Sequence, residues 1–220
     1  GALLIPQEPI TNDLRRFFSE KEWDAKAFME LLSKHQATPE MLLYRMSQVL
    51  PGLFGLNSIF YLRFTNSEDR LSVNLTKELN MTETLVPYGL GLREHYCRRW
   101  LPLRLLKEVR HNIIPLTAGA QRIHFVQSGT RFLLLSMARP LSLAKNRESA
   151  IAIGFKIDAK TAGQVSFIDD PGIDEEEVGE TCERCPLTDC SERVVEASII
   201  SRQNREHRRE TALQNFIQQI

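Results

Sequence analysis

Long hydrophobic runs are absent from this sequence. No stretch approaches the roughly 20 apolar residues that a membrane-spanning helix requires, so we expect no transmembrane segment and no membrane partner. The first ten residues, GALLIPQEPI, lack the basic and apolar regions of a secretory signal, and they lack an initiator methionine. We therefore expect a cytoplasmic protein and a chain that has been cut from a longer one.

An excess of charge of either sign is also absent. Lys and Arg together number 28, as do Asp and Glu, so net charge gives no argument for a polyanionic partner. Charge is uneven locally, because basic residues predominate between Gly91 and His111. The stretch from Asp169 to Glu183 contains eight acids and no base. Either stretch can be a partner surface, but a solvated face is the commoner outcome.

The familiar motifs of catalysis are missing as well. The sequence contains no G-x-S-x-G, H-E-x-x-H, Walker or G-x-G-x-x-G pattern. His95 and Cys97 lie two residues apart, whereas a nucleophilic thiol and its base normally come from different elements. A thiol-dependent enzyme that uses Cys97 or the Cys182/Cys185 pair stays an alternative, but we expect no enzyme activity.

Cysteine is scarce, but three of the four cysteines lie close together in the sequence. Cys182, Cys185 and Cys190 form a C-x2-C-x4-C pattern, and Cys97 lies far upstream. Thiolates two residues apart can bind one metal centre from a single turn, and a remote thiolate can complete the set of four. Without a sign of export, metal ligation is favoured over a disulfide framework. The sequence therefore predicts a metal centre held by these four cysteines.

The ligand type does not distinguish zinc from an iron–sulfur cluster, because both bind four thiolates. Structural zinc sites usually pair two C-x2-C turns, whereas a four-iron cluster tolerates wider and uneven spacing. The spacing alone leaves the two metals about equal. Four arginines adjoin the cysteines in sequence and can offset the negative charge of the centre: Arg98, Arg99, Arg184 and Arg193. We expect Arg184 to be the most solvated of them.

The hydrophobic pattern predicts helices towards both ends of the chain and mainly strands between them. Helices are expected at residues 14–34, at 38–50 with a stop at Pro51-Gly52, at 101–109, and at 202–220 as a closing amphipathic helix. Strands are expected at residues 58–64, near 71–75, and at 122–127, 131–138, 150–157 and 164–168. The clearest hairpin joins residues 122–127 to 131–138.

This order of elements predicts an α+β fold with two parts. Residues 1–55 form a helical segment. Residues 56–220 form a GAF/PAS-like mixed, mainly antiparallel sheet with flanking helices and a cysteine-rich metal loop. Basic residues near strand ends beside an apolar pocket suit the phosphates of a nucleotide-like or coenzyme ligand, although an exposed charged loop is commoner. The loop in question carries Arg139, Lys145 and Arg147.

Two segments carry a resemblance to a known family. EHYCRRW (94–100) and VGETCERCPLTDCSER (178–193) resemble the C-terminal domain of the short-chain fatty-acyl transcriptional regulators. These are bacterial XRE-type proteins with an N-terminal helix-turn-helix and a segment like the ImmA/IrrE metallopeptidases. The mycobacterial regulators of propionate and glyoxylate metabolism belong to them. ALLIP (2–6) and TPEMLLYRM (38–46) resemble the end of the metallopeptidase-like part, within the helical segment 1–55.

The resemblance implies the effector-sensing part of a cytoplasmic transcriptional regulator. It implies a [4Fe-4S] cluster on the residues that match Cys97, Cys182, Cys185 and Cys190, with zinc as the alternative. It also implies CoA or a short-chain acyl-CoA as effector, and we expect this ligand at Arg98, Arg99, Arg139, Lys145 and Arg147.

The sequence departs from the family pattern in two respects. No helix-turn-helix is recognisable, so DNA binding would belong to a domain absent from this chain. No H-E-x-x-H is present, so peptidase activity is not expected. We expect the chain to form a homo-oligomer. A structural zinc domain that serves as a protein-interaction module is the alternative function.

Overall fold

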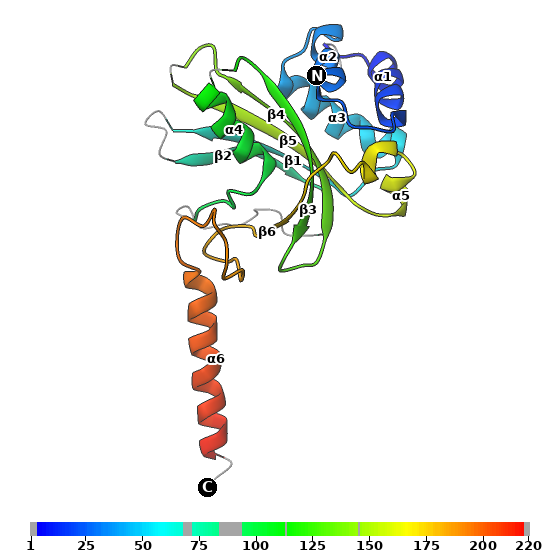
Figure 1. Cartoon of the computed structure of the whole chain (residues 1–220). Helices are drawn as coiled ribbons and strands as arrows, with labels where there is room; N and C mark the ends of the chain where they lie inside the picture. The colour runs from blue at the N-terminus through cyan, green and yellow to red at the C-terminus, as the bar shows by residue number, and fades with distance from the viewer. Residues whose placement is uncertain (1–3, 68–71, 84–93, 113, 145, 218–220) are drawn as a thin grey trace.

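A six-stranded sheet forms the centre of the molecule (Figure 1). The computed structural model describes residues 4–67, 72–83, 94–112, 114–144 and 146–217. The strands lie in the order β2-β1-β5-β4-β3-β6, and every neighbouring pair is antiparallel except β3 and β6. Their bounds are Ile59–Asn66 for β1, Val73–Asn80 for β2, Thr117–Phe125 for β3, Arg131–Pro140 for β4, Glu148–Lys156 for β5 and Glu175–Val178 for β6. The predicted α+β class with a mainly antiparallel sheet is confirmed.

Helices cover both faces of the sheet. On one face lie α1 (Gln7–Ser19), α2 (Ala25–Lys34) and α3 (Pro39–Phe54), and on the other lies α4 (Leu101–Asn112). Successive side chains of a strand point to opposite faces, so the central strand β4 supplies both cores. Leu133 and Leu135 pack with α1–α3, whereas Phe132 and Leu134 pack with α4. The nearly continuous apolar sequence of β4 follows from this burial on both faces.

The helix α3 extends further than the sequence predicted. A stop was expected at Pro51-Gly52, but α3 continues to Phe54 and ends at Gly55, whose φ of 68° is left-handed. Proline removes one intrahelical hydrogen bond and normally breaks a helix interior. Leu50 and Phe54 are both buried in the core that α3 shares with the sheet. We attribute the continuation of the helix to this packing.

The helix expected at residues 14–34 is two helices, α1 and α2, because Asp24 caps a new helix by accepting hydrogen bonds from the N–H groups of Lys26 and Ala27. The expected strand at 164–168 is wrong. That segment follows the short helix α5 (Ala159–Ala162) and overlaps the 3-10 helix η1 (Ser166–Asp169). Val165, Phe167 and Ile168 are buried, so the segment covers the edge of the core.

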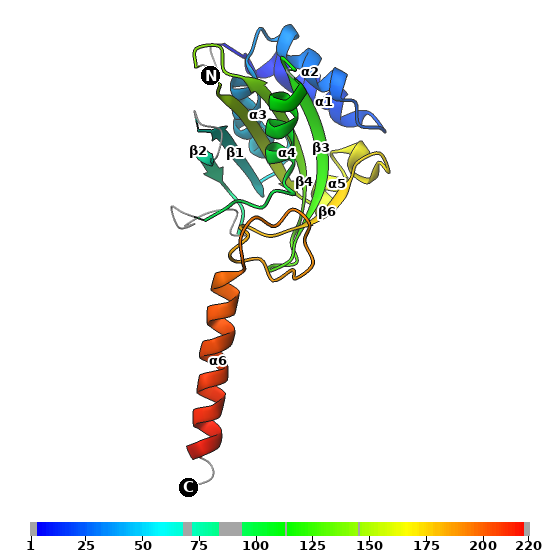
Figure 2. The same cartoon turned by 60° about the vertical axis from the view of Figure 1, so that its left-hand side comes forward.

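The last helix, α6, spans Ser198–Ile217 and begins four residues before the expected start. It does not close the fold: Figures 1 and 2 show it projecting straight away from the body of the protein. Every described side chain from Ser201 onward is exposed.

The predicted division into residues 1–55 and 56–220 stays a prediction. The end of α3 falls close to that boundary, yet α1–α3 share one hydrophobic core with β1, β4 and β5. None of the helices in the described part of the chain has the length and apolar character needed to span a membrane.

Candidate metal centre and the adjoining cleft

The structure brings the Cys97 segment alongside the loop that carries the other three cysteines. Tyr96 and Thr181 form an isolated antiparallel bridge. The Cys97 N–H donates to the Glu180 carbonyl oxygen at 3.2 Å, and the Cys182 N–H donates to the His95 carbonyl oxygen at 2.8 Å. Backbone hydrogen bonds therefore hold the remote cysteine beside the cysteine loop, residues 179–193, as the metal-centre hypothesis requires.

The thiols themselves are largely buried and free. Cys97, Cys182 and Cys185 are 6%, 7% and 5% exposed, Cys190 is half-buried, and none of the four forms a disulfide. Burial raises the pKa of the Cys97 thiol to about 11, although the N–H groups of Arg99 and Gly179 donate to it and oppose the shift. The proximity of Cys185 and Cys182 raises the pKa further. Three of the thiols thus lie close enough to influence one another electrostatically.

Gly179 occupies a position where any side chain would displace neighbouring atoms. A Cβ placed on it would lie 2.8 Å from the Cβ of Cys185 and 2.9 Å from its Sγ. Its carbonyl oxygen accepts a hydrogen bond of 3.0 Å from the indole N–H of Trp100, which is fully buried. The glycine of the Val178-Gly179 pair therefore allows Cys185 to pack directly on the start of the cysteine loop, and the hydrogen bond from Trp100 joins that start to the Cys97 segment.

Ion pairs and guanidinium contacts fix the loop from both sides. Arg184 forms a two-bond pair with Glu94, with both N···O distances 2.7 Å, and the Thr181 hydroxyl also donates to Glu94 at 2.8 Å. The Arg184 side chain, 36% exposed against 22% for that of Arg99, is thus held by an ion pair although it is partly solvated. Glu183 accepts hydrogen bonds from both the backbone N–H and the ring Nδ1 of His95.

Arg193 organises the interior of the loop. Its guanidinium donates to the carbonyl oxygens of Cys182 at 2.8 Å, Cys185 at 3.1 Å and Val195 at 3.3 Å, and also to that of Leu187. One planar fork thus binds four backbone groups, which an amine could not match. The guanidinium of Arg99 interacts with the Cys190 thiol, so the fourth cysteine also belongs to this region.

Within the described residues, no group of three or more His, Cys, Asp or Glu side chains stands arranged as ligands of one metal ion. The donor chemistry nevertheless suits a thiolate centre. Four free thiols occur in one region, the N–H groups of Arg99 and Gly179 donate to the Cys97 thiol, and the Arg99 guanidinium interacts with the Cys190 thiol. Such donors stabilise negative charge on thiolate sulfur.

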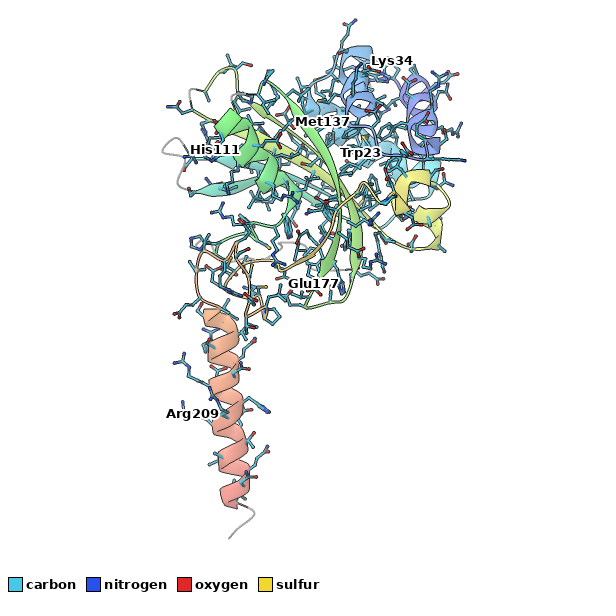
Figure 3. The ribbon with its side chains drawn as sticks, in the orientation of Figure 1. Trp23, Lys34, His111, Met137, Glu177 and Arg209 are labelled. Carbon is cyan, nitrogen blue, oxygen red and sulfur yellow. The ribbon has the colours of Figure 1, made fainter. Side chains whose placement is uncertain are left out.

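A cleft of about 980 Å³ adjoins the cysteine loop and runs along α4. Figure 3 labels His111, which lines the cleft at the C-terminal end of α4, and Glu177, whose carbonyl oxygen near the cysteine loop accepts a hydrogen bond from Arg99. The lining is rich in cations. These are Arg98, Arg99, Arg104, Lys107, Arg110 and Arg193, with His111 beside them. Four acids, Glu108, Glu148, Glu176 and Glu192, also line the cleft.

Of the five residues predicted to bind an effector, the structure places Arg98 and Arg99 in the cleft. Arg99 is 3.7 Å from the carboxylate of Glu176, whereas Arg98 shows no ion pair or hydrogen bond of its side chain in the described part of the chain. Arg139 lies elsewhere and donates to Glu40 at 2.9 Å. Arg147 does not line the cleft, and its buried Nε has no hydrogen-bond partner among the described residues. Lys145 falls outside the described residues.

Sequence reasoning missed the cations that α4 contributes to this cleft. Arg104, Lys107 and Arg110 lie at i, i+3 and i+6 of the helix and are exposed, while Leu103 and Leu106 are buried and line the base. The available signal was the basic stretch at residues 91–111, for which a solvated face was expected.

No protein-family model matches the chain, and no curated protein matches it in sequence. Among solved structures, the fold is similar to that of a Mycobacterium tuberculosis transcriptional regulator, with a TM-score of 0.55 and 14% sequence identity. The similarity covers 89% of this chain, and the chain spans 54% of the length of that protein. At this identity the likeness shows a shared fold.

Proposed function

We propose that this chain is the non-catalytic, effector-sensing part of a cytoplasmic bacterial transcriptional regulator. In this proposal four cysteines hold a metal centre and the adjoining cleft binds CoA or a short-chain acyl-CoA. The observation that carries the proposal is the sharing of residues between the two sites. Arg99 and Arg193 line the cleft, and the same side chains contact the cysteine loop.

The residues that would hold the metal are Cys97, Cys182, Cys185 and Cys190. A [4Fe-4S] cluster is our preferred occupant and would supply a redox-sensitive tie between the loop and the Cys97 segment. The fold brings the four thiols together and directs two N–H groups at Cys97. The positive charges of Arg193 and Arg99 in the same region would offset the negative charge of the thiolates.

The cleft has the size and charge for a phosphorylated coenzyme. Ligand pockets commonly range from about 300 to 1,000 Å³, and this cleft lies at the upper end. Guanidinium groups bind phosphate in a two-bond geometry, and Arg98 has no competing partner in the described part of the chain. Leu103, Leu106 and Val194 supply apolar lining for the acyl chain.

Effector binding and the state of the cysteine loop would then influence each other. A ligand that engages Arg99 and Arg193 competes with their contacts to the loop, so each state of the loop has its own affinity for the ligand. The resulting shift would be passed to a DNA-binding domain absent from this chain. The regulator whose fold is similar supports this reading at the level of fold.

Isothermal titration calorimetry with CoA and propionyl-CoA tests the effector site. We expect both to bind, and we expect Arg98→Ala and Lys107→Ala to weaken binding by about tenfold or more, as for a lost charged hydrogen bond. Arg15→Ala is the matched control, because Arg15 is exposed on α1, outside the cleft. No heat with either coenzyme, or equal weakening by the control variant, would contradict the proposal.

A structural zinc domain is the second candidate function. Gly179 packs closely against Cys185, and Arg193 donates hydrogen bonds to four backbone carbonyl oxygens of this region. Both features favour this function, because a structural zinc site needs a rigid loop. A colourless protein that binds one zinc per chain and no coenzyme would establish this alternative.

A further inference from the structure

Beyond its first turn, the helix α6 packs against no other segment of its own chain among the described residues. It is 20 residues long, which corresponds to about 30 Å, and every described side chain from Ser201 to Ile217 is exposed. Its described backbone connection to the body is in the first turn, where the Ile199 N–H donates to the Glu183 carbonyl oxygen at 3.2 Å. Figure 3 shows Arg209 far along the projecting helix.

Intrinsic propensity does not account for a stable helix of this kind. The segment contains a single alanine and several weak helix formers, including two asparagines, two serines, a histidine and a threonine. Most helical stability in proteins comes from packing of one face, and solitary helices are marginal in water. The helix therefore needs a partner surface.

The sequence of residues along one face of α6 indicates the identity of this partner. Ile199, Arg202, Glu206, Arg209 and Leu213 recur at spacings of three and four, as in the seam of a coiled coil. Ile217 follows on the same face. The stripe is apolar at both ends and charged in the middle. Leu213 and Ile217, which are 61% and 63% exposed, are costly to leave in water.

We infer that α6 pairs with α6 of a second copy of this chain, in antiparallel orientation about its midpoint near residues 207 and 208. Glu206 and Arg209 are equidistant from that midpoint, so each Glu206 would lie opposite the partner's Arg209, twice in the dimer. In the same register Ile199 would lie beside the end of the partner helix that carries Ile217, and Arg202 would lie opposite the partner's Leu213, where its aliphatic stem can cover that side chain. A parallel pair would instead place Glu206 opposite Glu206 and Arg209 opposite Arg209, which is unfavourable.

The antiparallel pair has a consequence for the rest of the molecule. Because α6 starts at the cysteine loop, the far end of the partner helix would lie next to that loop and to Val194, which is 49% exposed. The α6 helix of each chain would thus cover apolar surface on the other chain. The inference is independent of the proposed metal and effector.

Charge reversal tests the pairing through sedimentation velocity on the 220-residue chain. We expect the wild type to sediment as a dimer, and both Glu206→Arg and Arg209→Glu to raise the dimer dissociation constant by about tenfold or more, because like charges then face each other. The double variant E206R/R209E restores opposite charges and should restore the dimer. Glu and Arg have similar helix propensity, and circular dichroism checks that the helix is retained.

Arg208→Glu is the matched control. Arg208 lies about 140° around the helix from the centre of the stripe, and the same charge change there should leave the dimer intact. A wild type that sediments as one chain at all concentrations would overturn the inference, as would a double variant that fails to recover. Binding of duplex DNA by a single chain, weakened equally by Arg208→Glu and Arg209→Glu, would also overturn it.

Discussion

Gly179→Ala is the substitution whose effect on stability follows most directly from the structure. The added Cβ would lie 2.8 Å from the Cβ of Cys185 and 2.9 Å from its Sγ, closer than real Cβ contacts. Relief requires that Cys185 or the backbone at Gly179 move, because the side chain of Cys185 is buried. Overpacking of this kind costs about 1–3 kcal/mol, so we expect the free energy of unfolding to fall by about 2 kcal/mol.

The same displacement should disturb the thiol of Cys185, so metal content should fall together with stability. Urea unfolding and elemental analysis on the same preparations measure both effects. Gly52→Ala is the matched control, because nothing lies within 4 Å of a Cβ at this position in α3. There the substitution should be neutral or should stabilise the helix by up to about 1 kcal/mol. Equal stability and metal content in wild type and Gly179→Ala would refute the close packing of the loop.

Two further predictions concern arginine contacts. Arg193→Lys keeps the charge but loses the planar fork that binds four carbonyl oxygens, so we expect lower metal content and faster proteolysis within residues 179–193, whereas Arg15→Lys should change neither. Burial raises the pKa of Glu40, but hydrogen bonds, including those from Arg139, outweigh it and hold the pKa below its ordinary value of 4.5. The folded state therefore binds this proton less readily than the unfolded chain. Its contribution to stability is complete above pH 4.5 and is lost as the pH falls through the native pKa. Arg139→Ala should reduce the difference in unfolding free energy between pH 7 and pH 3, and an unchanged difference would contradict this coupling.

Local patterns in the sequence predicted most of the sheet. The β3–β4 hairpin was recognisable because two apolar segments flank Gly129, whose φ is 68°. The cysteine spacing predicted that Cys97 would meet the loop, and backbone hydrogen bonds do join these segments. These features depend on residues that are neighbours in the sequence, or on residue types such as cysteine that have few structural roles. They could therefore be predicted from the sequence alone.

The strand β6 was missed for a physical reason. The acidic stretch from Asp169 to Glu183 was expected to be a solvated face, whereas in the structure Glu175 and Glu176 pair with cations from distant segments. Glu175 binds Arg131 at 2.7 Å, and Glu176 lies 3.7 Å from Arg99. The cations of α4 in the cleft were missed for the same reason, because the lining also comes from the ends of β1, β2 and β5, from β6, from Arg98 and Arg99, and from residues 191–194. No local pattern reports which distant segments will meet.

The four-thiolate centre can be tested by iron, sulfide and zinc analysis of anaerobically prepared wild type and Cys97→Ser. We expect several irons per chain, with matching sulfide, in the wild type. We expect Cys97→Ser to lose most of this metal, because backbone hydrogen bonds hold Cys97 against the cysteine loop. A wild type that binds neither metal, or a Cys97→Ser variant with unchanged metal content and stability, would contradict the four-thiolate centre.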